Sequence, residues 1–243
     1  ENMLTKFLSY EEAVRFEAYI RGKDALNLYV PLAGNCEFIR KSVLERVGGW
    51  NEESLSEDID VSIRITKEGH RIRYAPDVIL WQENPATLTQ LVKQRTRWYR
   101  GEMEVLLKHG RLLTHPNTKN IDAEITLLCP LLLVLCLVGY ILGMFTFMLP
   151  FDQLAISMTK SMWILNVLAL SAVGMSLLVV TKQRKARKIL WLPFIYMYWS
   201  LQIVLSSYAL LLILLRKRRA WPKTETDGTV TDTFFKSYNG IKK

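Results

Sequence analysis

Apolar and polar positions divide the chain into two parts with different patterns. Up to residue 115, apolar residues recur at the spacings of amphipathic elements, whereas from Ile125 onward they form long continuous runs. The runs cover residues 125–149, 162–181 and 189–215, and each meets the roughly 20 residues that a helix needs to cross a bilayer core. We therefore predict an amino-terminal part at 1–115, transmembrane helices within 116–215, and a polar tail at 216–243.

The amino-terminal part mixes helical and strand-like patterns. Residues 4–20 are amphipathic at helical spacing, and residues 39–50 indicate a short helix that Gly48 and Gly49 end. The apolar segments 28–33 and 70–81 predict strands. The expected fold class is an α/β domain followed by an α-helical transmembrane region.

The segment LSEDIDVSIR places three carboxylates within four positions: Glu57, Asp58 and Asp60. Its isoleucine and valine residues alternate, which by period alone indicates a strand. However, Ser56 is a good N-cap, the carboxylates would occupy the first turn, and Gly69 can end a helix. We therefore predict a helix between Ser56 and Gly69.

A basic and aromatic helix is expected at residues 87–109. Thr87 and Gln90 form a possible capping box, and apolar residues then recur at roughly helical spacing with arginines between them. Such a helix, carrying Trp98 and Tyr99, can lie flat at a membrane surface. An ordinary surface helix packed on a core fits the pattern equally well.

Charge and cysteine content narrow the choice of partners. The net charge is +9 and the isoelectric point is near 9.5, with basic residues clustered beside the apolar runs. This arrangement favours contact with anionic membrane lipids over binding to nucleic acid. The three cysteines cannot form a disulfide framework, which is typical of a reduced, cytosol-facing domain. Basic clusters at 182–188 and 216–219 both favour the cytoplasmic side, although one predicted span separates them.

The pattern also suggests a chemistry. On a helix, Gln94, Arg97 and Trp98 share one face, because they are three and four residues apart. A guanidinium can grip phosphate oxygens with two hydrogen bonds, and an indole ring can cover the apolar face of a sugar. A nearby carboxylate could accept a proton from a hydroxyl. Together these groups predict transfer from a phosphate ester to an alcohol at a membrane surface.

The order of these motifs resembles a known family. The segment GNCEFIRKSVLERVGGWNEESLSEDIDVSIRI, followed by QRTRW and by membrane spans, is similar to the membrane-embedded family-two glycosyltransferases. These include cellulose, chitin, hyaluronan and poly-N-acetylglucosamine synthases. The resemblance is close from about Tyr10 to Leu113, and it extends to the spans only in kind.

The resemblance implies roles for the acidic residues. Asp58 matches the aspartate of the family's TED motif, the general base that deprotonates the acceptor hydroxyl, and Glu57 has a supporting role. Ser56 stands where threonine is usual. For Asp60 the resemblance implies no catalytic part, and we expect it to complement the helix amino terminus.

The resemblance also implies the binding residues. In the motif Q(Q/R)xRW, the polar residues hold the nucleotide diphosphate and the tryptophan stacks on the acceptor sugar. The matching donor residues here are Gln94, Arg95 and Arg97, and the acceptor residue is Trp98. The loop in the acceptor-side position is Gly34-Asn35-Cys36.

The family also implies a divalent ion, Mg²⁺ or Mn²⁺, held by an aspartate pair in its donor-binding half. The one D-x-D here, Asp58-Ile59-Asp60, belongs to the other motif, and His70, His109 and His115 are scattered, so we expect no metal site in this chain. The chain is interpreted as the acceptor half of a GT-A-type domain plus a membrane region, expected to be inactive alone. The implied partners are a nucleotide sugar, such as a UDP-sugar, and a polysaccharide or lipid-linked acceptor.

Two other functions remain open. Without the metal-binding half, the chain could be a non-catalytic membrane scaffold. A channel or transporter is less favoured, because the predicted spans carry no ionised residue in mid-segment. For the leading reading we expect a multi-pass protein of the cell membrane with its catalytic part in the cytoplasm.

Overall fold

The protein is described by a computed structural model of residues 2–110, 116–148, 153–180 and 192–219. A helical run opens the chain and contains a π-helical segment, η1. Its pieces are α1 (Met3–Val14), η1 (Arg15–Ile20) and α2 (Arg21–Ala25). Three further helices complete the amino-terminal part: α3 (Lys41–Arg46), α4 (Glu57–Lys67) and α5 (Leu88–His109). Three long helices follow: α6 (Thr118–Met148), α7 (Gln153–Val180) and α8 (Leu192–Leu214).

The predicted helices at the two motifs are confirmed. α4 begins after Ser56 and ends before Gly69, whose φ of +78° suits a glycine that stops a helix. At the start of α5, the Thr87 side chain accepts a hydrogen bond from the Gln90 amide, and Oε1 of Gln90 accepts one from the Thr87 amide. Both capping-box donors are thus satisfied. The helix predicted at residues 4–20 is also present, as α1 and η1.

The predicted strands are wrong, and the described residues contain no β-strand. A strand needs a neighbouring strand to satisfy its backbone groups. In segment 28–33, the Tyr29 amide instead donates to the Asp122 carboxylate of α6 at 3.0 Å. In segment 70–81, Arg71 and Arg73 are held by Asp24 through their side chains. Apolar sequence without a hydrogen-bonding neighbour therefore forms irregular chain here.

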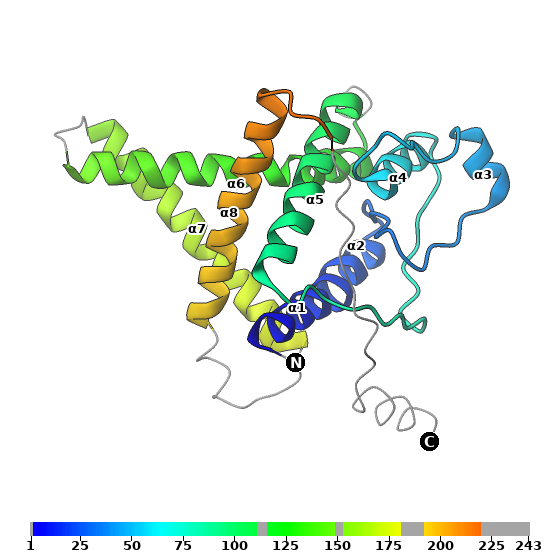
Figure 1. Cartoon of the computed structure of the whole chain (residues 1–243), viewed down its shortest axis with the longest axis horizontal. Helices are drawn as coiled ribbons and strands as arrows, with labels where there is room; N and C mark the ends of the chain where they lie inside the picture. Colours follow the sequence, from blue (N-terminus) through cyan, green and yellow to red (C-terminus); the bar gives the residue numbers. More distant parts are fainter. Residues whose placement is uncertain (1, 111–115, 149–152, 181–191, 220–243) are drawn as a thin grey trace, which may run out of the picture.

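The core beneath the two motifs is shared by α4, α5 and α6. Figure 1 shows α4 beside the carboxyl-terminal end of α5, with α6 running past both. The buried cluster at this junction consists of Tyr29, Ile59, Ile63, Val105, Leu106, Ala123 and Leu127. Its burial fixes the face that α4 turns toward α5, and with it the direction of the acidic first turn.

Helix α5 also packs along α8 (Figure 1). The Tyr99 hydroxyl donates to Oε1 of Gln202, a fully buried residue of α8, at 2.8 Å. The next residue of α5, Arg100, donates from Nη2 to the carbonyl of Lys217, just after α8, at 2.7 Å. These bonds hold α5 against α8 and the segment that follows it.

Two helical stretches are long and apolar enough to cross a membrane, judged by length and composition among the described residues: Thr118–Phe145 and Met197–Leu214. They overlap two of the predicted spans. The third predicted span, 162–181, coincides largely with α7 and stays a prediction. The basic cluster at 182–188 and residues 220–243 of the tail lie outside the described residues.

Candidate active site

Asp58 lies in the first turn of α4 and is half-buried. Its Oδ1 accepts a hydrogen bond from the Ile59 amide at 2.8 Å. Burial raises the pKa of Asp58 above its ordinary value, and Glu57 raises it further, whereas the Ile59 amide and the charge of Arg15 act in the opposite direction. A carboxylate with a raised pKa holds a proton more strongly, which suits a general base.

The loop at residues 34–36 packs directly against this carboxylate. Gly34 has a φ of +75°, and a β-carbon on it would lie 3.0 Å from Oδ2 of Asp58. Both the left-handed backbone and the close approach therefore require glycine. The Gly34 amide donates to Oε1 of Glu37 at 2.6 Å, which fixes the loop in this position.

The other two residues of the predicted acceptor loop point elsewhere. Nδ2 of Asn35 donates to Oε1 of Gln82 at 2.8 Å. Cys36 has a φ of +50° and an exposed side chain. The loop thus contacts Asp58 through Gly34, and Cys36 lies at the surface, open to an incoming molecule.

Helix α5 approaches the start of α4 most closely at Gly101. A β-carbon on Gly101 would lie 2.9 Å from the backbone nitrogen of Ser56 and would overlap its hydroxyl. One turn earlier, Nη1 of Arg97 donates to the carbonyl of Leu55 at 3.1 Å. These contacts set the position of the QRTRW motif relative to the acidic turn.

Arg97 lies within the field of the acidic cluster. Burial lowers the pKa of Arg97, and the charges of Glu57 and Asp58 oppose this shift. The guanidinium that the sequence assigns to a diphosphate is therefore close enough to the assigned base for their charges to interact.

Trp98 is half-buried and lies between cations. The guanidinium carbon of Arg95 is 4.4 Å from the centroid of its ring, and that of Arg15 is 5.8 Å away. Both distances permit cation–π attraction. Arg15 also acts on Asp58, so Trp98 and Asp58 have a charged neighbour in common.

The two remaining donor-site candidates have different surroundings. Arg95 is buried, and its Nη2 bonds Oε2 of Glu11 at 2.6 Å. That same oxygen accepts the Tyr198 hydroxyl at 2.6 Å. Contact of Arg95 with a diphosphate would require this ion pair to open. Gln94 is half-buried, and its side chain makes no hydrogen bond within the part of the chain that the structure describes.

Two charged residues at this site were not anticipated from the sequence. Glu102 is one turn beyond Trp98 on the same face of α5, and burial raises its pKa to about 7, with Asp58 adding to the increase. Helical spacing from the motif could have identified Glu102. No such signal exists for Arg15, because it reaches the site from η1 through the tertiary fold.

Asp60 faces away from this group of residues. It is fully buried and bonds Arg64 at 2.7 Å, His109 at 3.0 Å and Lys108 at 3.2 Å. Burial disfavours its charge, but the hydrogen bonds from His109 and Lys108 and the charge of Arg64 outweigh burial and lower the pKa of Asp60. Asp58 and Asp60 therefore cannot act together as a pair of metal ligands.

Within the described residues, no group of three or more histidine, cysteine, aspartate or glutamate side chains could hold a metal ion. His109 is occupied by Asp60, and His70 is half-buried in the irregular segment before Arg71. His115 lies outside the described residues.

Comparison with known proteins identifies the family. "Glycosyl transferase family group 2" matches residues 1–217. The chain is 34% identical over 109 residues to "Probable glycosyltransferase YdaM" of Bacillus subtilis (strain 168), covering 44% of this chain and 26% of that protein. It is 34% identical over 107 residues to "Poly-beta-1,6-N-acetyl-D-glucosamine synthase" of Staphylococcus aureus (strain COL), again covering 44% and 26%.

The matched region thus spans about a quarter of the length of these curated relatives. No solved structure matches the chain. Because the family match covers most of the sequence, including both motifs, the chain belongs to glycosyl transferase family group 2.

Proposed function

We propose that this chain forms the acceptor side and membrane part of an inverting GT-A-type glycosyltransferase. The enzyme moves a sugar from a nucleotide-diphosphate donor, such as a UDP-sugar, to a polysaccharide or lipid-linked acceptor. The observation that carries the proposal is the environment of Asp58: a half-buried carboxylate of raised pKa, packed on Gly34 and sharing its field with Arg97. Family membership supports sugar transfer as the reaction.

In this proposal Asp58 takes the proton from the acceptor hydroxyl, with Glu57 raising its basicity. The hydroxyl oxygen forms a bond to the anomeric carbon as the bond from that carbon to the diphosphate breaks. Attack from the face opposite the leaving group inverts the configuration at the anomeric carbon. Arg97, with Gln94 and Arg95 beside it on α5, binds the negative charge of the departing diphosphate.

Trp98 and the loop at 34–36 serve the acceptor. An indole ring stacks on the apolar face of a sugar, and the flanking Arg15 and Arg95 hold the ring in a fixed orientation. Gly34 leaves the face of Asp58 uncovered by a side chain, so a hydroxyl can approach the carboxylate.

The divalent ion that the family resemblance implies does not fit the described residues. Asp60 is fully engaged by three partners on the other face of α4, and no alternative cluster of ligands is present among the described side chains. We therefore assign no step to a metal ion in this chain.

The proposed location is the cell membrane, with several spans and a cytoplasmic catalytic part. The two candidate spans support the membrane assignment. The basic residues at 216–219 directly follow one of them, and such clusters favour the cytoplasmic leaflet.

The test compares two aspartate variants of the protein expressed from its full gene. Asp58→Asn should lower sugar transfer by about 10² to 10⁴ because the general base is lost, with donor binding largely retained. Asp77→Asn, which removes the same charge from an exposed turn, should transfer normally. Membranes are incubated with a panel of radiolabelled nucleotide sugars, and products are separated by length.

Each result has a defined reading. A long product supports a polysaccharide acceptor, and a single-sugar lipid product supports a lipid-linked one. Normal transfer by the Asp58→Asn variant would remove Asp58 from its assigned role and leave the non-catalytic membrane scaffold as the better reading.

A further inference from the structure

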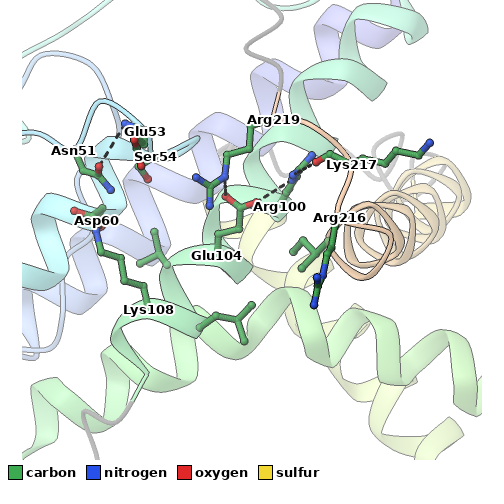
Figure 2. Close-up of a pocket in the computed structure, with 13 residues that line it drawn as sticks. Asn51, Glu53, Ser54, Asp60, Arg100, Glu104, Lys108, Arg216, Lys217 and Arg219 are labelled. Atoms are coloured by element: carbon green, nitrogen blue, oxygen red, sulfur yellow. Dashed lines mark hydrogen bonds and ion pairs between the residues drawn. The ribbon is translucent and has the colours of Figure 1, made fainter.

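A cavity of about 600 Å³ lies next to α4, α5 and the end of α8 (Figure 2). It is lined by Asp60 of α4 and Arg100 of α5. Each is two residues after its counterpart at the candidate active site, which corresponds to a rotation of about 200° around the helix. The cavity is therefore distinct from the site that contains the proposed base.

Three regions distant in sequence meet at this cavity: the loop at 51–54, helix α5, and the end of α8 with the segment after it. Figure 2 shows Lys108 of α5 reaching Asp60, and Glu104 of α5 beside Arg100 and Arg219. Glu104 binds Nε of Arg100 and Nε of Arg219, both at 3.0 Å. These ion pairs hold the cavity wall together.

Positive charge is in excess in the cavity. Its lining contains three carboxylates, Glu53, Asp60 and Glu104, and five cations, Arg100, Lys108, Arg216, Lys217 and Arg219. Glu104 and Asp60 are both matched by ion pairs. Within the described chain, neither the Arg216 nor the Lys217 side chain forms an ion pair. Figure 2 shows the Lys217 ammonium pointing away from Asp60 and Lys108, so Arg216 is the unpaired cation available to an anion.

The cavity also has an apolar border. Val105, Leu107 and Ile213 contribute to its lining, and Leu107 is 73% exposed. Ile213 belongs to the candidate span that ends at Leu214, two residues before Arg216. A ligand here would thus meet cations and the end of an apolar helix at the same place.

We propose that this cavity binds the phosphate head group of an acidic phospholipid, with the acyl chains directed along α8. Guanidinium and ammonium groups bind phosphate oxygens, and basic residues at the end of a membrane span attract anionic lipids. Because the cavity joins α5 to the end of α8, the bound lipid stabilises the contact between these two elements. The proposal does not depend on the identity of the sugar or on transfer activity.

The test adds one negative charge at the border of the cavity without removing an existing ion pair. The full chain is purified and placed in neutral phosphatidylcholine nanodiscs that contain a minor fraction of phosphatidylglycerol, and retained lipid is measured by native mass spectrometry. Leu107→Glu should reduce retention of phosphatidylglycerol about tenfold, because like charges repel across a binding surface. Leu88→Glu, the same change at an exposed position of the same helix, should retain it normally.

A second pair of variants removes positive charge instead. Arg216→Gln should also reduce retention, whereas Lys93→Gln, which removes an exposed cation elsewhere on α5, should not. Equal phosphatidylglycerol retention by the wild type and both cavity variants would overturn the proposal. Displacement of the lipid by inorganic phosphate alone would assign the site to a soluble anion and overturn the lipid assignment.

Discussion

The two faces of α4 carry carboxylates two residues apart whose pKa values are shifted in opposite directions. Asp58 is half-buried beside Gly34, and burial raises its pKa. Asp60 is fully buried among Arg64, Lys108 and His109, which lower its pKa. Asp58 and Asp60 lie in the same helical turn, so the opposite shifts of their pKa values come from the partners that the fold places beside each of them. We propose the Asp58 face for proton transfer, whereas the ion pairs of Asp60 hold α4 on α5.

The largest expected effect comes from breaking the structural face. Asp60→Asn removes the carboxylate that binds Arg64, Lys108 and His109, and should lower the free energy of unfolding by about 3 kcal/mol. Because folding lowers the pKa of Asp60, its contribution is present at neutral pH and is lost as pH falls below about 3.9 toward the folded-state value. Denaturant unfolding followed by circular dichroism measures the change.

The control for that prediction is Asp77→Asn, at an exposed position, which should unfold like the wild type. Equal stability of the Asp60 and Asp77 variants would show that the ion pairs around Asp60 do not hold α4 in place.

A smaller loss of stability is expected from disturbing the contact between Gly101 of α5 and Ser56 at the start of α4, because this contact positions both faces of α4. Gly101→Ala forces a methyl group against Ser56 at the start of α4, and should destabilise the fold by about 1–3 kcal/mol while displacing the acidic turn. Gly22→Ala is the matched control, since no atom lies within 4 Å of the position of its added β-carbon. Thermal unfolding and transfer activity should both decline in the first variant alone.

The subtlest prediction concerns the pH dependence of transfer. The proposed base must be deprotonated, so activity should fall on the acid side as Asp58 gains a proton. Arg15→Gln removes a charge that lowers the pKa of Asp58, so the acid limb should move to higher pH. Glu57→Gln removes a charge that raises this pKa, so the limb should move to lower pH.

If the acid limb moves in opposite directions in these two variants, the titrating group is Asp58, on the candidate active-site face of α4. The same displacement in both, or none in either, would indicate that a group other than Asp58 controls the profile. His70→Gln, at the far end of α4, serves as the control and should leave the profile unchanged.

The parts of the molecule that depend on local signals were predictable from the sequence. The capping box of Thr87 and Gln90 starts α5, and Gly69 follows the end of α4, because such signals act within a few residues. Ser56 precedes α4 as predicted, although its side chain makes no capping hydrogen bond. The order of the two motifs also predicted the candidate residues of the active site. Glu102 could have been added by extending the face of Trp98 by one turn.

The rest depends on contacts between distant segments. Arg15 reaches Trp98 from η1, and Asp60 finds Lys108 and His109 at the opposite end of α5. The segments 28–33 and 70–81 have the composition of strands, yet a strand is defined by its neighbour, and here side chains such as Asp122 take the backbone bonds instead. Neither side-chain contacts between distant segments nor the presence of a neighbouring strand produces a periodic pattern in the sequence.

The attachment of α5 to α8 has a mechanical consequence. Tyr99 is bonded to Gln202 in the middle of the contact, and Arg100 is bonded to the backbone just beyond the end of α8. Tyr99 and Arg100 are consecutive residues, so the two bonds tie a single turn of α5 to two separate positions, one within α8 and one just after it. Because Trp98 directly precedes Tyr99, a tilt of α8 would be transmitted to this turn of α5 and so to the residue that we propose for the acceptor.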